Sequence, residues 1–147
     1  MNENGPSPVT DISEWAEGAH ERAAGIAEML GVAVEDYTKS PISLLPNLQN
    51  YVDRLPLQDF EQSDWVTLHT DLSAYLGDLL VLSHNAEWVK VDDPSSPVGY
   101  RYLIQAEGTD GEFRQVEPFD VVMEEFEHLP IEIGRMIANS EEALHLN

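Results

Sequence analysis

The sequence contains no cysteine, which excludes disulfides, thiolate metal sites and cysteine nucleophiles. This composition fits a reducing compartment, and we expect the protein in the cytoplasm. No apolar run approaches the roughly 20 residues that a membrane-spanning helix needs. Residues 1–8 have neither the basic nor the apolar region of a secretory signal. We therefore expect a soluble protein that does not bind membranes.

Basic side chains are also scarce. The 147 residues include 28 acidic but only 7 basic ones, and the net charge is −21. Most carboxylates therefore lack a basic neighbour, and the resulting field repels nucleic acid and attracts basic proteins. Solubility, or a cytosol rich in salt, is the alternative explanation for this charge. A hydrophobic content of 42% is sufficient for the core of one domain.

Five amphipathic helices are predicted from apolar residues at helical spacing. Residues 1–9 are rich in Asn, Gly, Pro and Ser, which is typical of a disordered arm, and residues 10–147 are expected to form one domain. The predicted helices cover about 10–30, 43–55, 63–83, 119–129 and 133–144, and residues 32–42 are expected to be a connector.

The spacing of apolar residues changes from about 3.6 to 2 in the middle of the chain. This alternation predicts strands over about 87–91, 98–107 and 112–116, and Gly108 to Gly111 is typical of a hairpin turn. Short loops between the strands favour a three-stranded antiparallel meander over about 87–117, covered on one face by helices. The predicted fold is therefore α+β, with helices before and after the sheet.

Two acidic stretches are the strongest candidates for a functional surface. Asp64, Asp71 and Asp78 recur every seven residues, which places them on one line of the third predicted helix. Like charges on a helix are destabilising, so a surface that keeps them is expected to complement a basic partner. The alternative is an ordinary solvated face. The second stretch has no basic residue and contributes Glu117, Asp120, Glu124, Glu125 and Glu127.

Three Glu-x-x-His pairs raise the question of a metal site, because this spacing supplies ligands in di-metal helical bundles. The first two pairs fall away from the apolar stripes of their predicted helices, and the histidine of the third is two residues from the C-terminus, where fraying is expected. The strands also leave too few helices for such a bundle. We therefore predict no metal ligand, no cofactor and no catalytic residue. The pairs are Glu17 with His20, Glu125 with His128, and Glu142 with His145.

Two other features have a chemical and a structural interpretation. His69 lies on the apolar face of the third helix, where a catalytic or pH-sensitive role is possible, but a core histidine bonded to the backbone is the favoured interpretation. Asp92 and Asp93 precede Pro94, and a turn is favoured over a cation site. No Gly-x-Ser-x-Gly motif and no phosphate-binding glycine loop is present.

The run Ala74-Tyr75-Leu76-Gly77-Asp78, followed by Trp88-Val89 and then Pro118-Phe119, resembles a loose group of small bacterial domains of unknown function. The resemblance covers about residues 60–128, and Asp78 stands where Glu is more common. It implies a bacterial source, and some small acidic proteins of this kind act as immunity proteins beside toxins. In physical terms, Gly77 permits another element to approach the helix closely, and Trp88 supplies a large core anchor.

The leading hypothesis is a non-catalytic, acidic protein-binding module that engages a basic partner protein, as an immunity protein engages a toxin. It would not bind nucleic acid directly. One alternative is a mimic of nucleic acid that blocks a DNA- or RNA-binding protein. Others are a metal-dependent enzyme that uses the Glu-x-x-His pairs, and a housekeeping or scaffold domain whose acidity serves solvation. The sequence leaves the partner and the oligomeric state open.

Overall fold

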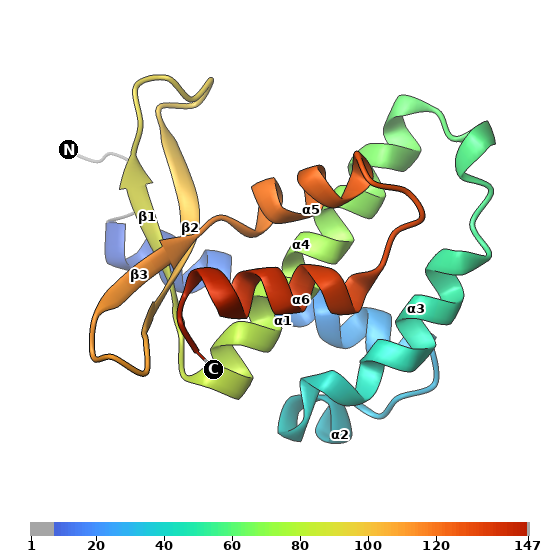
Figure 1. The fold of residues 1–147 in the computed structure, drawn as a ribbon, viewed down its shortest axis with the longest axis horizontal. Helices are drawn as coiled ribbons and strands as arrows, with labels where there is room; N and C mark the ends of the chain where they lie inside the picture. Colours follow the sequence, from blue (N-terminus) through green and yellow to red (C-terminus); the bar gives the residue numbers. More distant parts are fainter. Residues whose placement is uncertain (1–7, 147) are drawn as a thin grey trace.

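The computed structural model describes residues 8–146 and has the predicted α+β architecture. N-terminal helices precede a small sheet, and C-terminal helices follow it (Figure 1). The helices are α1 (Pro8–Met29), α2 (Val34–Lys39), α3 (Leu45–Asp53), α4 (Gln62–His84), α5 (Pro118–Phe126) and α6 (Ile133–Ala143), with short 3₁₀ turns η1 (Pro41–Leu44) and η2 (Leu57–Asp59). The strands are β1 (Glu87–Asp92), β2 (Tyr100–Glu107) and β3 (Phe113–Val116).

The N-terminal region differs from the prediction in two places. Helix α1 begins at Pro8, where a proline is tolerated because the first helical N–H groups have no intrahelical partner. Residues 8 and 9 of the predicted disordered arm are therefore helical, and residues 1–7 lie outside the described residues. The connector predicted for residues 32–42 is wrong, because α2 and η1 form there. Tyr37 is fully buried, and such burial favours a short helix that propensity alone would not support.

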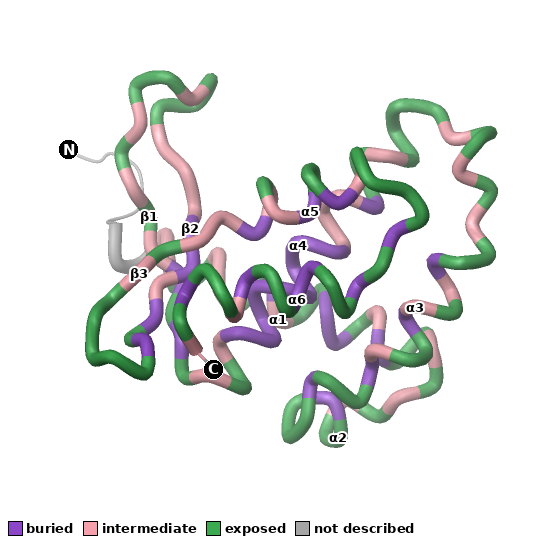
Figure 2. The backbone as a smooth tube through the Cα atoms, in the orientation of Figure 1, coloured by how far each residue is buried: buried purple, intermediate pink, exposed green. Residues whose placement is uncertain are grey.

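Helix α4 is the centre of the fold. All residues from Leu72 to Leu80 are buried, so this part of the helix is covered on every side (Figure 2). Helices α1 and α5 and strands β1 and β2 all contact it. The helix therefore fixes the relative positions of the N-terminal helices, the sheet and the C-terminal helices.

The sheet is the predicted antiparallel meander in the order β1-β2-β3. Trp88 pairs with Ile104 across β1 and β2, and both side chains are buried, so this face of the sheet meets the helices. The turn between β2 and β3 includes Gly111, whose φ of +83° is accessible to glycine at little cost. Strand β2 begins at Tyr100, two residues later than predicted, and residues 98 and 99 belong to the loop that follows Asp92.

Gly77 and Trp88, which the sequence identified separately as a site of close approach and as a core anchor, are in direct contact. A Cβ atom built on Gly77 would lie only 2.6 Å from Trp88 Cη2, and closer still to Cζ2. The indole of β1 therefore rests directly on the backbone of α4, in a space that any larger residue would occupy. This contact fixes the distance between the sheet and the central helix.

The C-terminal segment closes the other side of the core. Gln49 on α3 donates a hydrogen bond to the Ile131 carbonyl at 2.9 Å and accepts one from the Ile133 N–H at 2.8 Å. These bonds hold the first turn of α6 against α3. Between Pro8 and Leu146, no helix is both long enough and apolar enough to cross a membrane.

Candidate partner-binding surface

The line of aspartates on α4 is not one acidic face. Asp64 is exposed and takes part in a capping box with Glu61 at the start of the helix. Asp71 is half-buried and accepts a hydrogen bond from Arg22 of α1 at 2.7 Å. Asp78 is only 3% exposed. The expectation that Asp71 and Asp78 lie on a free partner-binding face is therefore wrong, because α1 packs across this line of the helix.

Asp78 is instead a buried acceptor that ties three helices together. The Tyr37 hydroxyl of α2 donates to Asp78 Oδ2 at 2.6 Å, and His20 Nδ1 of α1 lies 2.9 Å from the same oxygen. One carboxylate oxygen of α4 therefore contacts side chains of both α1 and α2. Burial, and then the negative charge of Asp78, raise the pKa of Tyr37, so its hydroxyl remains a donor.

The second acidic stretch also divides between internal and exposed groups. Glu125 is only 3% exposed, so its prediction as a partner-binding residue is wrong. The guanidinium of Arg135 on α6 donates to both carboxylate oxygens, and the Glu132 N–H donates at 3.0 Å. Burial raises the pKa of Glu125, but the hydrogen bonds from Arg135 and Glu132 outweigh it and hold the pKa below its usual value.

Glu117 belongs to a cluster around Arg101, which the sequence did not predict to be paired. Arg101 lies 2.5 Å from Glu117, 2.8 Å from Asp93 and 3.8 Å from Asp120. Burial and the nearby Asp120 raise the pKa of Glu117, and Arg101 opposes this shift only in part because three carboxylates share its charge. Asp93 also accepts bonds from the Ser95 N–H and hydroxyl, which confirms the turn predicted there.

Three of the predicted residues form an exposed acidic ridge on α5. Asp120, Glu124 and Glu127 are exposed and follow one another at i, i+4 and i+7, which places them along one side of the helix. Within the described chain, the only basic side chain within 4.0 Å of the ridge is Arg101, at 3.8 Å from Asp120. The acidic ridge therefore keeps the uncompensated charge that the sequence suggested for the whole stretch.

An apolar groove between α4 and α5 lies beside the ridge and was not predicted. Val66 of α4 is 55% exposed, Met123 of α5 47%, and Leu129 after α5 53%. These side chains line a hollow of about 380 Å³, together with the half-buried rings of Trp65 and Phe126. The two rings make an edge-to-face contact with centroids 5.1 Å apart, so the floor of this α4–α5 groove is rigid and aromatic.

The position of Met123 joins the groove to the acidic ridge. Asp120 and Glu127 are three residues before and four residues after Met123, so both carboxylates are its neighbours on the helix surface. Met123 therefore places one exposed apolar side chain of the groove directly beside the acids of the ridge. Met123 was grouped with the apolar residues of its helix because it is three residues before Phe126, and this spacing favoured the interior.

His69 is a structural residue at the floor of this groove. Its Nε2 lies 2.7 Å from the Phe119 carbonyl oxygen, which accepts the hydrogen bond. The imidazole also packs edge-to-face against Phe119 and Phe126. The predicted bond to the backbone is present, but the imidazole is only half-buried and lines the groove instead of lying in the core. Its role is to join α4 to α5 and so to shape the groove.

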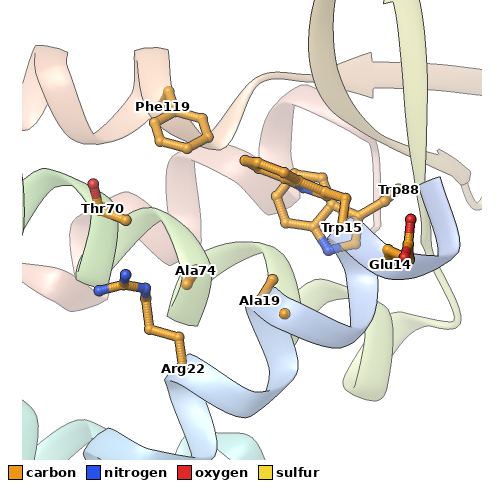
Figure 3. A pocket seen from close by; sticks show the side chains of 9 residues that line it. Glu14, Trp15, Ala19, Arg22, Thr70, Ala74, Trp88 and Phe119 are labelled. Carbon is orange, nitrogen blue, oxygen red and sulfur yellow. The ribbon is translucent and has the colours of Figure 1, made fainter. Parts of the chain in front are cut away.

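A second hollow, of about 290 Å³, lies between α1, α4, β1 and α5 (Figure 3). Its walls include the rings of Trp15, Trp88 and Phe119, and Glu14 and Arg22 lie among its lining residues. Trp15 stacks on Tyr102 with centroids 3.9 Å apart, which fixes the orientation of the indole. The sequence predicted Trp88 only as a core anchor, so this cavity was also missed.

The Glu-x-x-His pairs are dispersed over the structure. His20 binds Asp78, Glu125 is enclosed by Arg135, and Glu142 and His145 are exposed at the end of α6. The expectation that Glu125 faces away from the core is wrong, because α6 covers it. Among residues 8–146, no group of three or more His, Cys, Asp or Glu side chains is arranged to hold a metal ion.

Comparisons with known proteins add no relative: no protein-family model, no curated protein and no solved structure matches this chain. The candidate surface is therefore defined by its own geometry.

Proposed function

We propose that this chain is a non-catalytic protein-binding module that engages a basic partner protein through the α4–α5 groove and the acidic ridge. The mode of action would be that of an immunity protein bound to a toxin, in the cytoplasm. The observation that carries the proposal is the exposed Met123, placed between Asp120 and Glu127 on the wall of an apolar hollow.

The surface favours a particular kind of occupant. The α4–α5 groove offers apolar contacts over an aromatic floor, and the ridge offers carboxylates along one edge only. An amphipathic partner segment, with apolar side chains on one face and Lys or Arg along one border, complements both features. The apolar contacts would supply most of the affinity, while the charges would speed association and select the partner.

A designed amphipathic helical peptide of Leu and Lys provides a first test, with a peptide of the same composition but scrambled order as its control. Binding can be measured by isothermal titration and by the fluorescence of Trp65. We expect Met123→Ser to weaken binding about tenfold, because a buried apolar contact is lost. Met29→Ser is the matched control, since Met29 is another exposed methionine on a helix, and it should leave the affinity unchanged.

The charged part of the surface has its own matched control. Replacing the three ridge acids by Gln should weaken binding about tenfold and reduce its salt dependence. The same replacement of three exposed acids of α1, namely Glu17, Glu21 and Glu28, changes the net charge equally and should have little effect. Equal losses for both triple variants would mean that net charge alone drives association, and the proposal would then be wrong.

The natural partner can then be sought by affinity capture from cell lysate with the wild-type chain and the same variants. A partner that supports the proposal is lost with Met123→Ser and at high salt, but is retained by Met29→Ser. Competition by DNA or RNA for the captured protein would instead favour the nucleic-acid mimic, since an interface built on the groove does not require the partner's nucleic-acid site.

A further inference from the structure

The cavity between α1, α4, β1 and α5 has an unusual lining for its size. Three aromatic rings line it, from Trp15, Trp88 and Phe119, and the small side chain of Ala74 lies between them and Arg22 (Figure 3). Gly18 is also among its lining residues. Its volume of about 290 Å³ is just below the range of about 300–1,000 Å³ that is typical of ligand pockets. A small head group, rather than a large ligand, fits this space.

Gly18 keeps the cavity open on the side of α1. A Cβ atom built on this residue would meet no other atom within 4 Å. Glycine in a helix interior is less favourable than alanine, and no packing contact within the described chain requires it here. Trp15 and Arg22, which also line the cavity, are three residues before and four residues after Gly18, so a side chain at this position would point into the same space.

The charges around the cavity favour a cation. Arg22 is neutralised by Asp71 at 2.7 Å, whereas Glu14 on the rim has no ion pair among the described residues. Trp15 and Phe119 also line a neighbouring hollow of about 520 Å³, where Arg101 is shared by three carboxylates. Both hollows therefore carry a net negative charge, and an anionic ligand would be repelled.

We propose that this aromatic cavity binds an organic ammonium group, such as a trimethylammonium head, with the cation held by the surrounding rings and by the carboxylate of Glu14. Aromatic rings attract alkylated ammonium ions through the negative potential of their faces, and nearby carboxylates add to this attraction. The ammonium group could belong to a free small molecule or to a methylated lysine of a polypeptide. This proposal does not depend on the partner-binding function, because the α4–α5 groove lies elsewhere.

The three tryptophans provide a built-in assay. Trp15 and Trp88 line the cavity, whereas Trp65 lies in the α4–α5 groove. Choline chloride, titrated into the ¹⁵N-labelled full chain, should shift the indole N–H signals of the first two and not of Trp65. The neutral carbon analogue 3,3-dimethylbutan-1-ol should bind at least tenfold more weakly. Equal affinity for the neutral analogue, or equal shifts at Trp65, would overturn the proposal.

Two variants and a matched control locate the site. Gly18→Leu fills the cavity and should weaken choline binding at least tenfold, while Gly25→Leu adds the same side chain two helical turns away and should not. Glu14→Gln, at an exposed position, should weaken choline binding several-fold without affecting the neutral analogue. Unchanged choline affinity in Gly18→Leu or in Glu14→Gln would contradict the assignment.

The source of the ammonium group can be distinguished with the same signals. A short peptide that contains trimethyllysine is compared with the unmodified peptide and with free choline. Affinity for the modified peptide at least tenfold above that for choline assigns the site to a methylated lysine side chain. If the affinity for the trimethyllysine peptide is no higher than that for choline, the site is assigned to a free small molecule. Tighter binding of the unmodified peptide than of the trimethyllysine peptide would refute recognition of an alkylated ammonium.

Discussion

Replacement of Gly77 by alanine tests the central contact of the fold. The new methyl group would lie 2.6 Å from Trp88 Cη2, whereas ordinary carbon–carbon contacts are about 3.5–4.0 Å. Trp88 is only 6% exposed and stands between α4 and the sheet, so the indole has little freedom to move away. Overpacking of a core typically costs about 1–3 kcal/mol, and a rigid ring places this site near the upper limit. Alanine regains about 1 kcal/mol of helix propensity, which leaves a net loss of about 2 kcal/mol.

Urea unfolding followed by far-UV circular dichroism measures this loss directly. Gly25→Ala on α1 is the control, because a Cβ there meets no atom within 4 Å, and it should stabilise the protein by about 0.5–1 kcal/mol. In a Trp88→Leu background the clash is removed, and Gly77→Ala should then be neutral or stabilising. The reasoning is refuted if Gly77→Ala is as stable as the wild type, or if its penalty persists without the indole.

Two further predictions concern the buried acids. Asp78→Ala should destabilise the protein by about 1–3 kcal/mol, because the buried Tyr37 hydroxyl loses its acceptor. Asp71→Ala, which removes only an exposed bond to Arg22, should cost at most about 1 kcal/mol, and similar losses for the two variants in urea unfolding would contradict this reasoning. The pKa of Glu125 is held below its usual value of 4.5, so its contribution to stability is present above that pH and is lost as the pH falls through the folded-state pKa. The free energy of unfolding of Glu125→Gln should therefore fall less than that of the wild type as the pH is lowered from 5. An unchanged pH dependence would show that Arg135 and the Glu132 N–H do not stabilise the ionised carboxylate.

The fold was largely predictable because most of its elements have a clear period and clear ends. The apolar alternation of the sheet and the glycines of its hairpin turn specified the meander and its order. The exception is α2, a six-residue helix that is stable only because Tyr37 is buried against α1 and α4. Such a helix depends on tertiary contacts and leaves little local signal, so its segment resembled a connector.

The candidate site was less predictable, because hydrogen bonds and ion pairs between residues far apart in the sequence leave no local sequence pattern. Spacing correctly placed Asp71 and Asp78 on one line of α4, but it could not show that α1 crosses that line. Glu125 looked unopposed for the same reason, since Arg135 approaches it from another helix. A close approach at Gly77 and a core position for Trp88 were each predicted, but the sequence did not show that these two residues contact each other.

The distribution of basic residues explains why the acidic ridge remains uncompensated. Four of the seven basic side chains form ion pairs away from the ridge, namely Arg22, Lys90, Arg114 and Arg135. Arg101 pairs with a cluster of carboxylates that reaches the ridge at only one residue. Lys39 is in the last turn of α2 and Arg54 is the C-cap of α3, where a positive charge favours the helix end.

The acids of the ridge flank Met123, and Met123 lines the same hollow as Val66 and Leu129. Exposed apolar side chains gathered in one place weaken solubility, while neighbouring acids restore it and repel other acidic surfaces. Solvation by itself accounts for the acids but not for the exposed apolar side chains. The proposed basic, amphipathic partner accounts for both, because it would cover the apolar side chains and pair with the acids.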